Sequence, residues 1–136
     1  MVQQPVKTIL IVDDESSIRR ALRAYFERAG FAVEEAASAR AALERVRVGG
    51  VVDGVVSDVL MPEVNGLAFY DQLLEVAPEL ANRVVFLTGA SGDPRVHGPI
   101  EQRGVPLLSK LDDYRLVVDA VRVALLRRTG PATLKS

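Results

Sequence analysis

Short apolar runs alternate along the chain with longer segments in which apolar residues recur every three or four positions. The short runs are rich in β-branched residues and end at turn signals, which is typical of strands. Strands are therefore predicted over residues 8–12, 31–36, 54–58, 83–89 and 105–110. The second run, FAVEEA, is half polar, and this predicts a strand at the edge of a sheet.

Helices are predicted between these strands. In the first helix the apolar residues fall on one face, Ser16 or Ser17 is expected to cap the start, and Gly30 is expected to end it. The other boundaries follow from similar signals: Ser38 and Gly49-Gly50 for the second helix, Leu67 to Ala77 before Pro78 for the third, and Asp112 or Asp113 to about Arg128 for the last.

The segment 90–104, ASGDPRVHGPIEQRG, is a poor candidate for the remaining helix. Gly98-Pro99 falls in its middle, and proline in a helix interior costs about 3 kcal/mol while glycine costs about 1 kcal/mol. Its apolar residues are scarce. We predict a short, broken or mobile segment, with His97 as an exposed loop residue.

The alternation of strands and helices predicts an α/β fold, an open doubly wound five-stranded parallel sheet with helices on both faces. In such sheets, sites form beyond the carboxyl ends of the strands. Asp13, Asp14, Asp58, Thr88 and Lys110 all stand at predicted carboxyl ends. The fold would therefore gather them at one edge of the sheet.

Composition narrows the function classes. The length of 136 residues predicts one domain. The net charge is −1, and the Lys and Arg residues are dispersed rather than clustered, so we expect no binding to nucleic acid or to an anionic membrane. The absence of cysteine excludes thiol chemistry and disulfides, and the single histidine excludes any site that needs two. No signal peptide and no 18-residue apolar run is present, so a cytoplasmic protein is expected.

Carboxylates gathered at one edge would repel one another. Two unit charges about 4 Å apart cost roughly 4 kcal/mol at an effective dielectric constant near 20. A hard divalent cation relieves that repulsion, and ligands that are all oxygen suit Mg²⁺. The alternative is that Asp13 and Asp14 are solvated acids that interact favourably with a helix N-terminus.

Taken together, these residues resemble the response-regulator receiver domain, the phosphoacceptor module of two-component signalling. The marks are Asp13-Asp14, Asp58 followed by Met61-Pro62 and Gly66, then Thr88 and Lys110. The resemblance covers residues 7–128, with residues 1–6 and 129–136 as tails, and it implies a flavodoxin-like strand order 2-1-3-4-5. The stretch 66–89 further resembles receivers of hybrid histidine kinases.

The resemblance also implies a Mg²⁺ site. Asp14 and Asp58 would bind the ion directly, and Asp13 would act mainly through water. The backbone carbonyl of Leu60 would complete the protein ligands.

By the same resemblance, Asp58 would accept a phosphoryl group from a histidine kinase or a histidine phosphotransfer protein. Thr88 and Lys110 would contact the phosphoryl oxygens, and position 107 would take part in the switch. Such a domain is not an enzyme in the usual sense, because it catalyses only its own phosphorylation and dephosphorylation.

The chain departs from the receiver pattern at several positions. Leu111 stands where receivers usually carry a proline after the lysine, so a trans bond is expected. Leu107 replaces the usual aromatic switch residue, which puts coupling by aromatic burial in question. Leu60 and Ala90 cannot orient an attacking water, which predicts a long-lived phosphorylated form.

The last predicted helix is unusually apolar, since nine of the eleven residues in 116–126 are apolar. Part of it is expected to meet another protein or a second copy, the alternative being deep burial within the chain. Only eight residues follow Arg128, so no output domain is expected, and the domain would signal through protein contacts.

Two other functions stay open. The first is a binding module that keeps the receiver fold but works without phosphorylation, which the departures at Leu107, Leu111 and 90–104 favour. The second is a Mg²⁺-dependent phosphatase with Asp58 as nucleophile. Such enzymes need a second acid two residues later, where this chain has Leu60.

Overall fold

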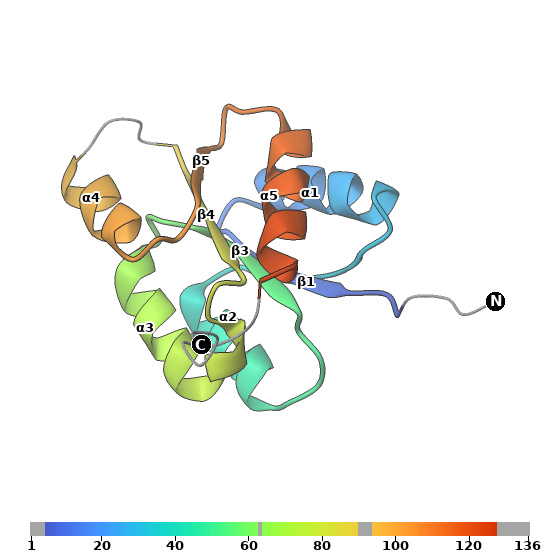
Figure 1. Ribbon diagram of the computed structural model, residues 1–136, viewed down its shortest axis with the longest axis horizontal. Coiled ribbons are helices and arrows are strands. Elements are labelled where there is room, and N and C mark those ends of the chain that lie inside the picture. Colours follow the sequence, from blue (N-terminus) through green and yellow to red (C-terminus); the bar gives the residue numbers. More distant parts are fainter. Residues whose placement is uncertain (1–4, 63, 90–93, 128–136) are drawn as a thin grey trace.

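The computed structural model describes residues 5–62, 64–89 and 94–127, and it has a central sheet between two layers of helices (Figure 1). The strands are β1 (Thr8–Val12), β2 (Ala32–Ala36), β3 (Gly54–Asp58), β4 (Val84–Thr88) and β5 (Leu107–Ser109). The helices are α1 (Ser16–Arg28), α2 (Ala39–Arg47), α3 (Gly66–Val76), the short 3₁₀ turn η1 (Pro78–Leu80), α4 (Pro94–Gln102) and α5 (Tyr114–Leu125).

All five strands are parallel and lie in the order β2-β1-β3-β4-β5, which confirms the predicted fold class and strand order. β2 lies at one edge, as its polar character predicts. The order reverses at β1 and β3, where the chain crosses to the other side of the sheet. In sheets of this kind, that reversal opens a crevice at the carboxyl ends of the central strands.

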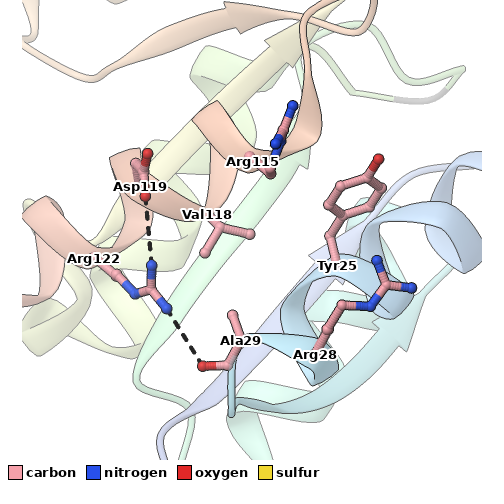
Figure 2. A pocket seen from close by; sticks show the side chains of 7 residues that line it. All are labelled: Tyr25, Arg28, Ala29, Arg115, Val118, Asp119 and Arg122. Atoms are coloured by element: carbon pink, nitrogen blue, oxygen red, sulfur yellow. Dashed lines mark hydrogen bonds and ion pairs between the residues drawn. The ribbon is translucent and has the colours of Figure 1, made fainter.

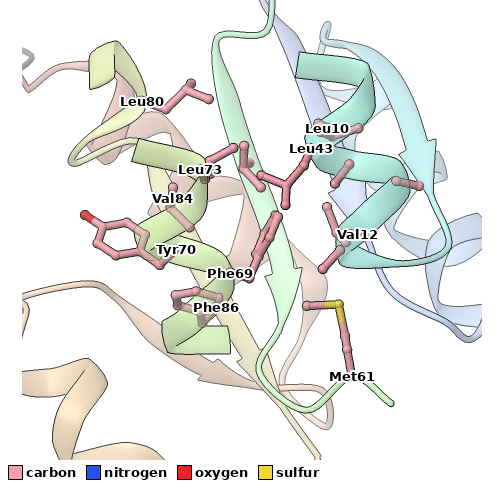
Figure 3. Packing of buried hydrophobic residues seen from close by; sticks show 14 of the residues in the cluster. Leu10, Val12, Leu43, Met61, Phe69, Tyr70, Leu73, Leu80, Val84 and Phe86 are labelled. Carbon is pink, nitrogen blue, oxygen red and sulfur yellow. The ribbon is translucent and has the colours of Figure 1, made fainter. Parts of the chain in front are cut away.

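Alternate residues of β1 point to opposite faces of the sheet and enter two separate cores. Ile9 and Ile11 pack with buried residues of α1 and α5, whereas Leu10 and Val12 pack with buried residues of α2 and α3. Figure 3 shows the second core, in which Phe69 and Leu73 of α3 lie against the sheet. Because both faces are covered, the central strands carry apolar residues that point to both faces of the sheet.

The sequence predicted a capping residue for α1, α2 and α5, and the structure confirms it for α2 and α5. The Ser38 and Asp113 side chains cap α2 and α5 by accepting backbone N–H bonds. For α1, the predicted cap at Ser16 or Ser17 is wrong, because the cap position is Glu15. The Glu15 side chain makes no capping bond, and the Asp13 side chain accepts the N–H of Glu15 itself.

β5 has only three residues, fewer than the predicted 105–110. Pro106 carries no N–H for a sheet bond, although its carbonyl accepts one from Phe86. Lys110 still bonds to β4, since its N–H donates to the Thr88 carbonyl at 2.9 Å. No cis peptide occurs among the described residues, as expected for Lys110-Leu111.

α4 is short, as predicted, but it is not interrupted at Gly98-Pro99. Pro99 removes one helical N–H, and the burial of Ile100, which is 1% exposed, compensates by anchoring the helix to the core. His97 is therefore a partly buried helical residue rather than an exposed loop residue. The predicted segment also includes residues 90–93, which lie outside the described residues.

Some apolar residues of α5 are buried in the core and others are exposed to solvent. Val117 and Val121 are in the core, whereas Leu116 and Val123 are 51% and 55% exposed. The exposed residues keep a partner contact open as a prediction. The helix ends at Leu125, before the predicted Arg128, which lies outside the described residues. None of the described helices is both long enough and apolar enough to cross a bilayer.

Candidate functional site

The carboxyl ends of β1 and β3 bring two acids together at the crevice. Val12 of β1 pairs with Ser57 of β3, so the next residues, Asp13 and Asp58, lie side by side. Both are buried, with 1% and 5% of their surface exposed, whereas Asp14 is exposed. One carboxylate oxygen from each of the three aspartates lies within 4.8 Å of the others.

Lys110 reaches this cluster from the end of β5. Its Nζ lies 2.9 Å from Asp58 Oδ2, 3.0 Å from Asp13 Oδ2 and 3.0 Å from Glu15 Oε1. Burial alone would lower the pKa of Lys110, but its bonds to Asp58, Asp13 and Glu15 outweigh that and raise the pKa above its ordinary value. Lys110 therefore stays an ammonium at neutral pH.

The backbone of Glu15 and the side chain of Arg19 hold Asp13 in place. Its Oδ1 accepts the Glu15 N–H at 2.8 Å, and its backbone carbonyl accepts a bond from Arg19 at 2.7 Å. Its Oδ2 is buried and accepts no hydrogen bond among the described residues, although Lys110 is at ion-pair distance. Burial raises the pKa of Asp13. The carboxylates of Asp13, Asp14 and Asp58 repel one another, and an added cation would relieve that repulsion.

Asp58 is oriented from two sides. Its Oδ2 accepts the bond from Lys110, and its Oδ1 accepts the Leu60 N–H at 3.1 Å. Leu60 thus contributes its amide to the site, and the role predicted for its carbonyl stays a prediction. Its side chain is 47% exposed beside the site. Ala90, the other residue expected to affect water access, lies outside the described residues.

Thr88 lies on β4, next to the strand that carries Asp58, and Leu107 lies one strand further on β5. Thr88 ends β4 and is 4% exposed, and its carbonyl holds the backbone of Lys110. Leu107 pairs with Phe86 and packs, partly buried, against the core. Movement at Thr88 can therefore reach β5 through the backbone, whatever side chain stands at position 107.

The donor set suits Mg²⁺ better than a transition metal. The acidic side chains here are those of Asp13, Asp14, Asp58 and Glu15, and the Lys110 ammonium contacts all of them except Asp14. Hard oxygen ligands with an excess of negative charge fit a small divalent cation. Among the residues that the structure describes, Asp13, Asp14 and Asp58 could hold such an ion.

The residues that the sequence analysis did not single out are Glu15 and Arg19. Glu15 is the third partner of Lys110, and Arg19 binds the Asp13 carbonyl while pairing with Glu35 of β2. Glu15 had a signal, since it directly follows the two aspartates. Its contact depends on how far two flexible side chains reach, which no sequence periodicity encodes.

Comparison with known proteins agrees with this geometry. The family profile described as "Response regulator receiver domain" matches residues 9–122. The sensor kinase CckA of Brucella abortus is 38% identical over 87 residues, which are 63% of this chain and 9% of that protein. The transcriptional regulatory protein SrrA of Staphylococcus aureus is 34% identical over 128 residues, which are 93% of this chain and 51% of that protein.

Solved structures agree as well. A response regulator receiver domain protein from Clostridium thermocellum superposes with a TM-score of 0.80 at 27% identity, covering 90% of this chain and 96% of that one. The chain spans about half of SrrA and much less of CckA. The similarity therefore concerns one domain of these larger proteins.

Proposed function

The chain belongs to the response regulator receiver domain family of two-component signalling, and from this premise we propose that Asp58 is its phosphoacceptor. The phosphodonor is a phosphohistidine on a histidine kinase or a phosphotransfer protein. The P–N bond to the donor imidazole breaks as a P–O bond to Asp58 forms, and the imidazole leaves with the bonding electron pair. The observation that carries the proposal is the ammonium of Lys110, 2.9 Å from Asp58 Oδ2.

Phosphoryl transfer depends mostly on positioning and on neutralising charge. Lys110 supplies one positive charge beside the nucleophile, and the Leu60 N–H fixes the other carboxylate oxygen. Bound Mg²⁺ would supply further charge neutralisation on the phosphoryl oxygens. Asp13, Asp14 and Asp58 would hold that ion, as their convergence and the buried Oδ2 of Asp13 support.

The phosphorylated form would differ from the free form at β4 and β5. A phosphoryl group on Asp58 offers Lys110 and Thr88 a new dianionic partner, so Lys110 would release part of its hold on Asp13 and Glu15. Because Lys110 is bonded to the Thr88 carbonyl, both strands would respond together. Leu107 would transmit the change by aliphatic repacking.

The same proposal has consequences for the approach of the phosphodonor and for the cellular compartment in which the domain signals. A phosphodonor must approach the exposed carboxyl end of the sheet, where Asp14 is accessible. Signalling would take place in the cytoplasm through protein contacts. The expected lack of an output domain stays a prediction, because the matched relatives are longer than this chain.

A second candidate is a receiver that binds its partner without phosphorylation. Leu111, which is 91% exposed where receivers usually carry proline, favours this possibility because the loop that follows Lys110 is atypical. The Mg²⁺-dependent phosphatase is less well supported. The side chain of Leu60, where such an enzyme needs an acid, carries no group for general acid–base catalysis.

Beryllofluoride, which mimics an aspartyl phosphate, separates the two candidates. In ¹⁵N NMR spectra with Mg²⁺, it should shift the amide signals of Leu60, Thr88 and Lys110. An Asp58→Asn variant should show no such shifts. A wild-type spectrum that is unchanged by beryllofluoride and Mg²⁺ would favour the phosphorylation-independent candidate.

A further inference from the structure

An open cleft of about 310 Å³ lies in the groove between the packed helices α1 and α5, on the face of the sheet opposite α2 and α3. Figure 2 shows that Val118 and Ala29 lie between the two helices, with Tyr25 beside them on α1. Three arginines, Arg28, Arg115 and Arg122, and one acid, Asp119, surround this apolar floor. The cleft combines an apolar base with a cationic rim, which is a pattern typical of a docking site.

The charge of this face departs from that of the whole protein. Residues 16–29 and 113–127 together contain seven arginines, no lysine and three acidic residues. The rest of the chain contains ten basic and fifteen acidic residues. The two helices therefore form a cationic face on a chain whose net charge is −1.

The rim arginines are available to an incoming group. Arg28 makes no ion pair among the described residues and lies 5.8 Å from the centre of the Tyr25 ring. Arg122 reaches Asp119 and the Ala29 carbonyl only at 3.5 Å, as the dashed lines in Figure 2 mark. Arg115 is bonded to Asp113, yet its side chain is 79% exposed.

We propose that the cleft between α1 and α5 binds a segment of a partner protein in which carboxylates flank an apolar side chain. The apolar side chain would cover Val118 and Ala29. The carboxylates would pair with Arg28 and Arg122, whose planar guanidinium groups bind carboxylates through two parallel hydrogen bonds.

Other occupants fit less well. A second copy in a symmetric dimer would bring the same cationic face against itself, and like charges repel. An extended polyanion such as a nucleic acid or an anionic membrane would meet Glu27, Asp113 and Asp119 among the arginines. It would also leave the concave apolar floor uncovered. A narrow peptide segment with both an apolar side chain and carboxylates would cover the apolar floor and pair with the arginines of the rim.

The two arginines that this partner would pair with, Arg28 and Arg122, lie away from the phosphoacceptor site. α1 and α5 both begin next to the aspartates and Lys110, whereas Arg28 ends α1 and Arg122 lies near the end of α5. At 1.5 Å per residue, the 13 residues of α1 place Arg28 roughly 18 Å along the helix from its start. The proposal therefore stands apart from phosphorylation and can be tested with Asp58→Asn protein.

The test is an NMR titration of ¹⁵N-labelled chain with a synthetic peptide in which glutamates flank leucine, and with a matched peptide carrying glutamine instead. The acidic peptide should shift the amides of Tyr25, Ala29 and Val118. An Arg28→Glu/Arg122→Glu variant should bind it at least tenfold more weakly. The double variant Arg40→Glu/Arg47→Glu makes an equal charge change at two exposed positions of α2, and it should bind the acidic peptide like the wild type.

Several results would overturn the proposal. They are no shifts up to millimolar peptide, shifts that centre elsewhere, or equal binding of the glutamine peptide. Concentration-dependent dimerisation in sedimentation that the double variant abolishes would assign the face to a second copy. Preferential binding to phosphatidylglycerol vesicles, lost in the double variant, would assign it to a membrane. Circular dichroism and thermal unfolding of the double variant check that a loss of binding is not a loss of fold.

Discussion

The ammonium nitrogen of Lys110 lies 2.9 Å from Oδ2 of Asp58, although the two residues are 52 positions apart in the sequence. The same nitrogen lies 3.0 Å from Asp13 and from Glu15. Before any ion or phosphoryl group arrives, Lys110 is thus the cation that holds the acids together. This arrangement makes ion binding and the position of Lys110 depend on each other.

Replacing Lys110 with glutamine should destabilise the protein in the presence of EDTA. The buried carboxylates of Asp13 and Asp58 would lose the cation that they share with the exposed Glu15, at a cost of about 1–3 kcal/mol in the free energy of unfolding. Mg²⁺ should then stabilise the variant more than it stabilises the wild type, because no ammonium competes with the ion. Urea unfolding with EDTA and with MgCl₂ measures both effects.

The control for this experiment is Lys7→Gln, which removes an exposed lysine from the segment before β1. It should change neither the free energy of unfolding nor the Mg²⁺ effect by more than about 0.5 kcal/mol. If Mg²⁺ stabilises Lys110→Gln no more than wild type, Lys110 does not compete with an ion at this site.

Glu15→Gln should remove the ion pair between Glu15 and Lys110 and should destabilise the protein only slightly. Because Glu15 is 58% exposed at its side chain, the loss should be about 0.5 kcal/mol in the free energy of unfolding without Mg²⁺. In the Lys110→Gln background the same change should have no effect. A double-mutant cycle measured by urea unfolding gives this coupling, and equal effects in the two backgrounds would show that Glu15 does not act through Lys110.

Gly66→Ala should destabilise the protein by about 1–3 kcal/mol. A β-carbon at Gly66 would lie 3.0 Å from the Val59 Cα and 3.1 Å from Phe86, in a core that cannot easily yield. The shift would also move the backbone next to Asp58. Gly98→Ala in α4 is the matched control, because nothing lies within 4 Å of its β-carbon. It should be neutral or stabilising by up to about 1 kcal/mol, and equal losses in thermal unfolding would contradict this account.

Glu35 should make stability depend on pH in the acid range. Hydrogen bonding to Arg23, together with Arg19, lowers the pKa of Glu35 below its ordinary value of 4.5. The carboxylate is favoured in the folded state, so this contribution is fully present above about pH 4.5 and is lost as the pH falls through the folded-state pKa.

Urea unfolding of wild type and Glu35→Gln at several pH values measures this contribution. The difference should be about 0.5–1 kcal/mol at pH 7 and should approach zero in acid. Glu44→Gln, whose ion pair with Arg47 is 3.9 Å long, should show a smaller difference. A difference for Glu35→Gln that grows on acidification would contradict the assigned pKa direction.

The sequence predicted much of the fold because strand patterns depend on burial of both faces. Gly54–Asp58 appears with the predicted bounds, and the acids at the strand ends meet as the parallel topology requires. The errors arose where tertiary contacts outweigh local preference. Ile100 anchors α4 despite Pro99, and α1 has Glu15 rather than a serine at its cap position, next to the Asp13 carboxylate that accepts the Glu15 N–H. The partnership of Glu15 with Lys110 depends on side-chain reach and has no periodic signature.

The most direct test of the central claim is the intact mass of the protein after incubation with acetyl phosphate and Mg²⁺. Wild type should gain the mass of one phosphate, and this gain should vanish with EDTA and with Asp58→Asn. Phosphate gained equally by the Asp58→Asn variant, or no gain by wild type in the presence of Mg²⁺, would contradict Asp58 as the phosphoacceptor.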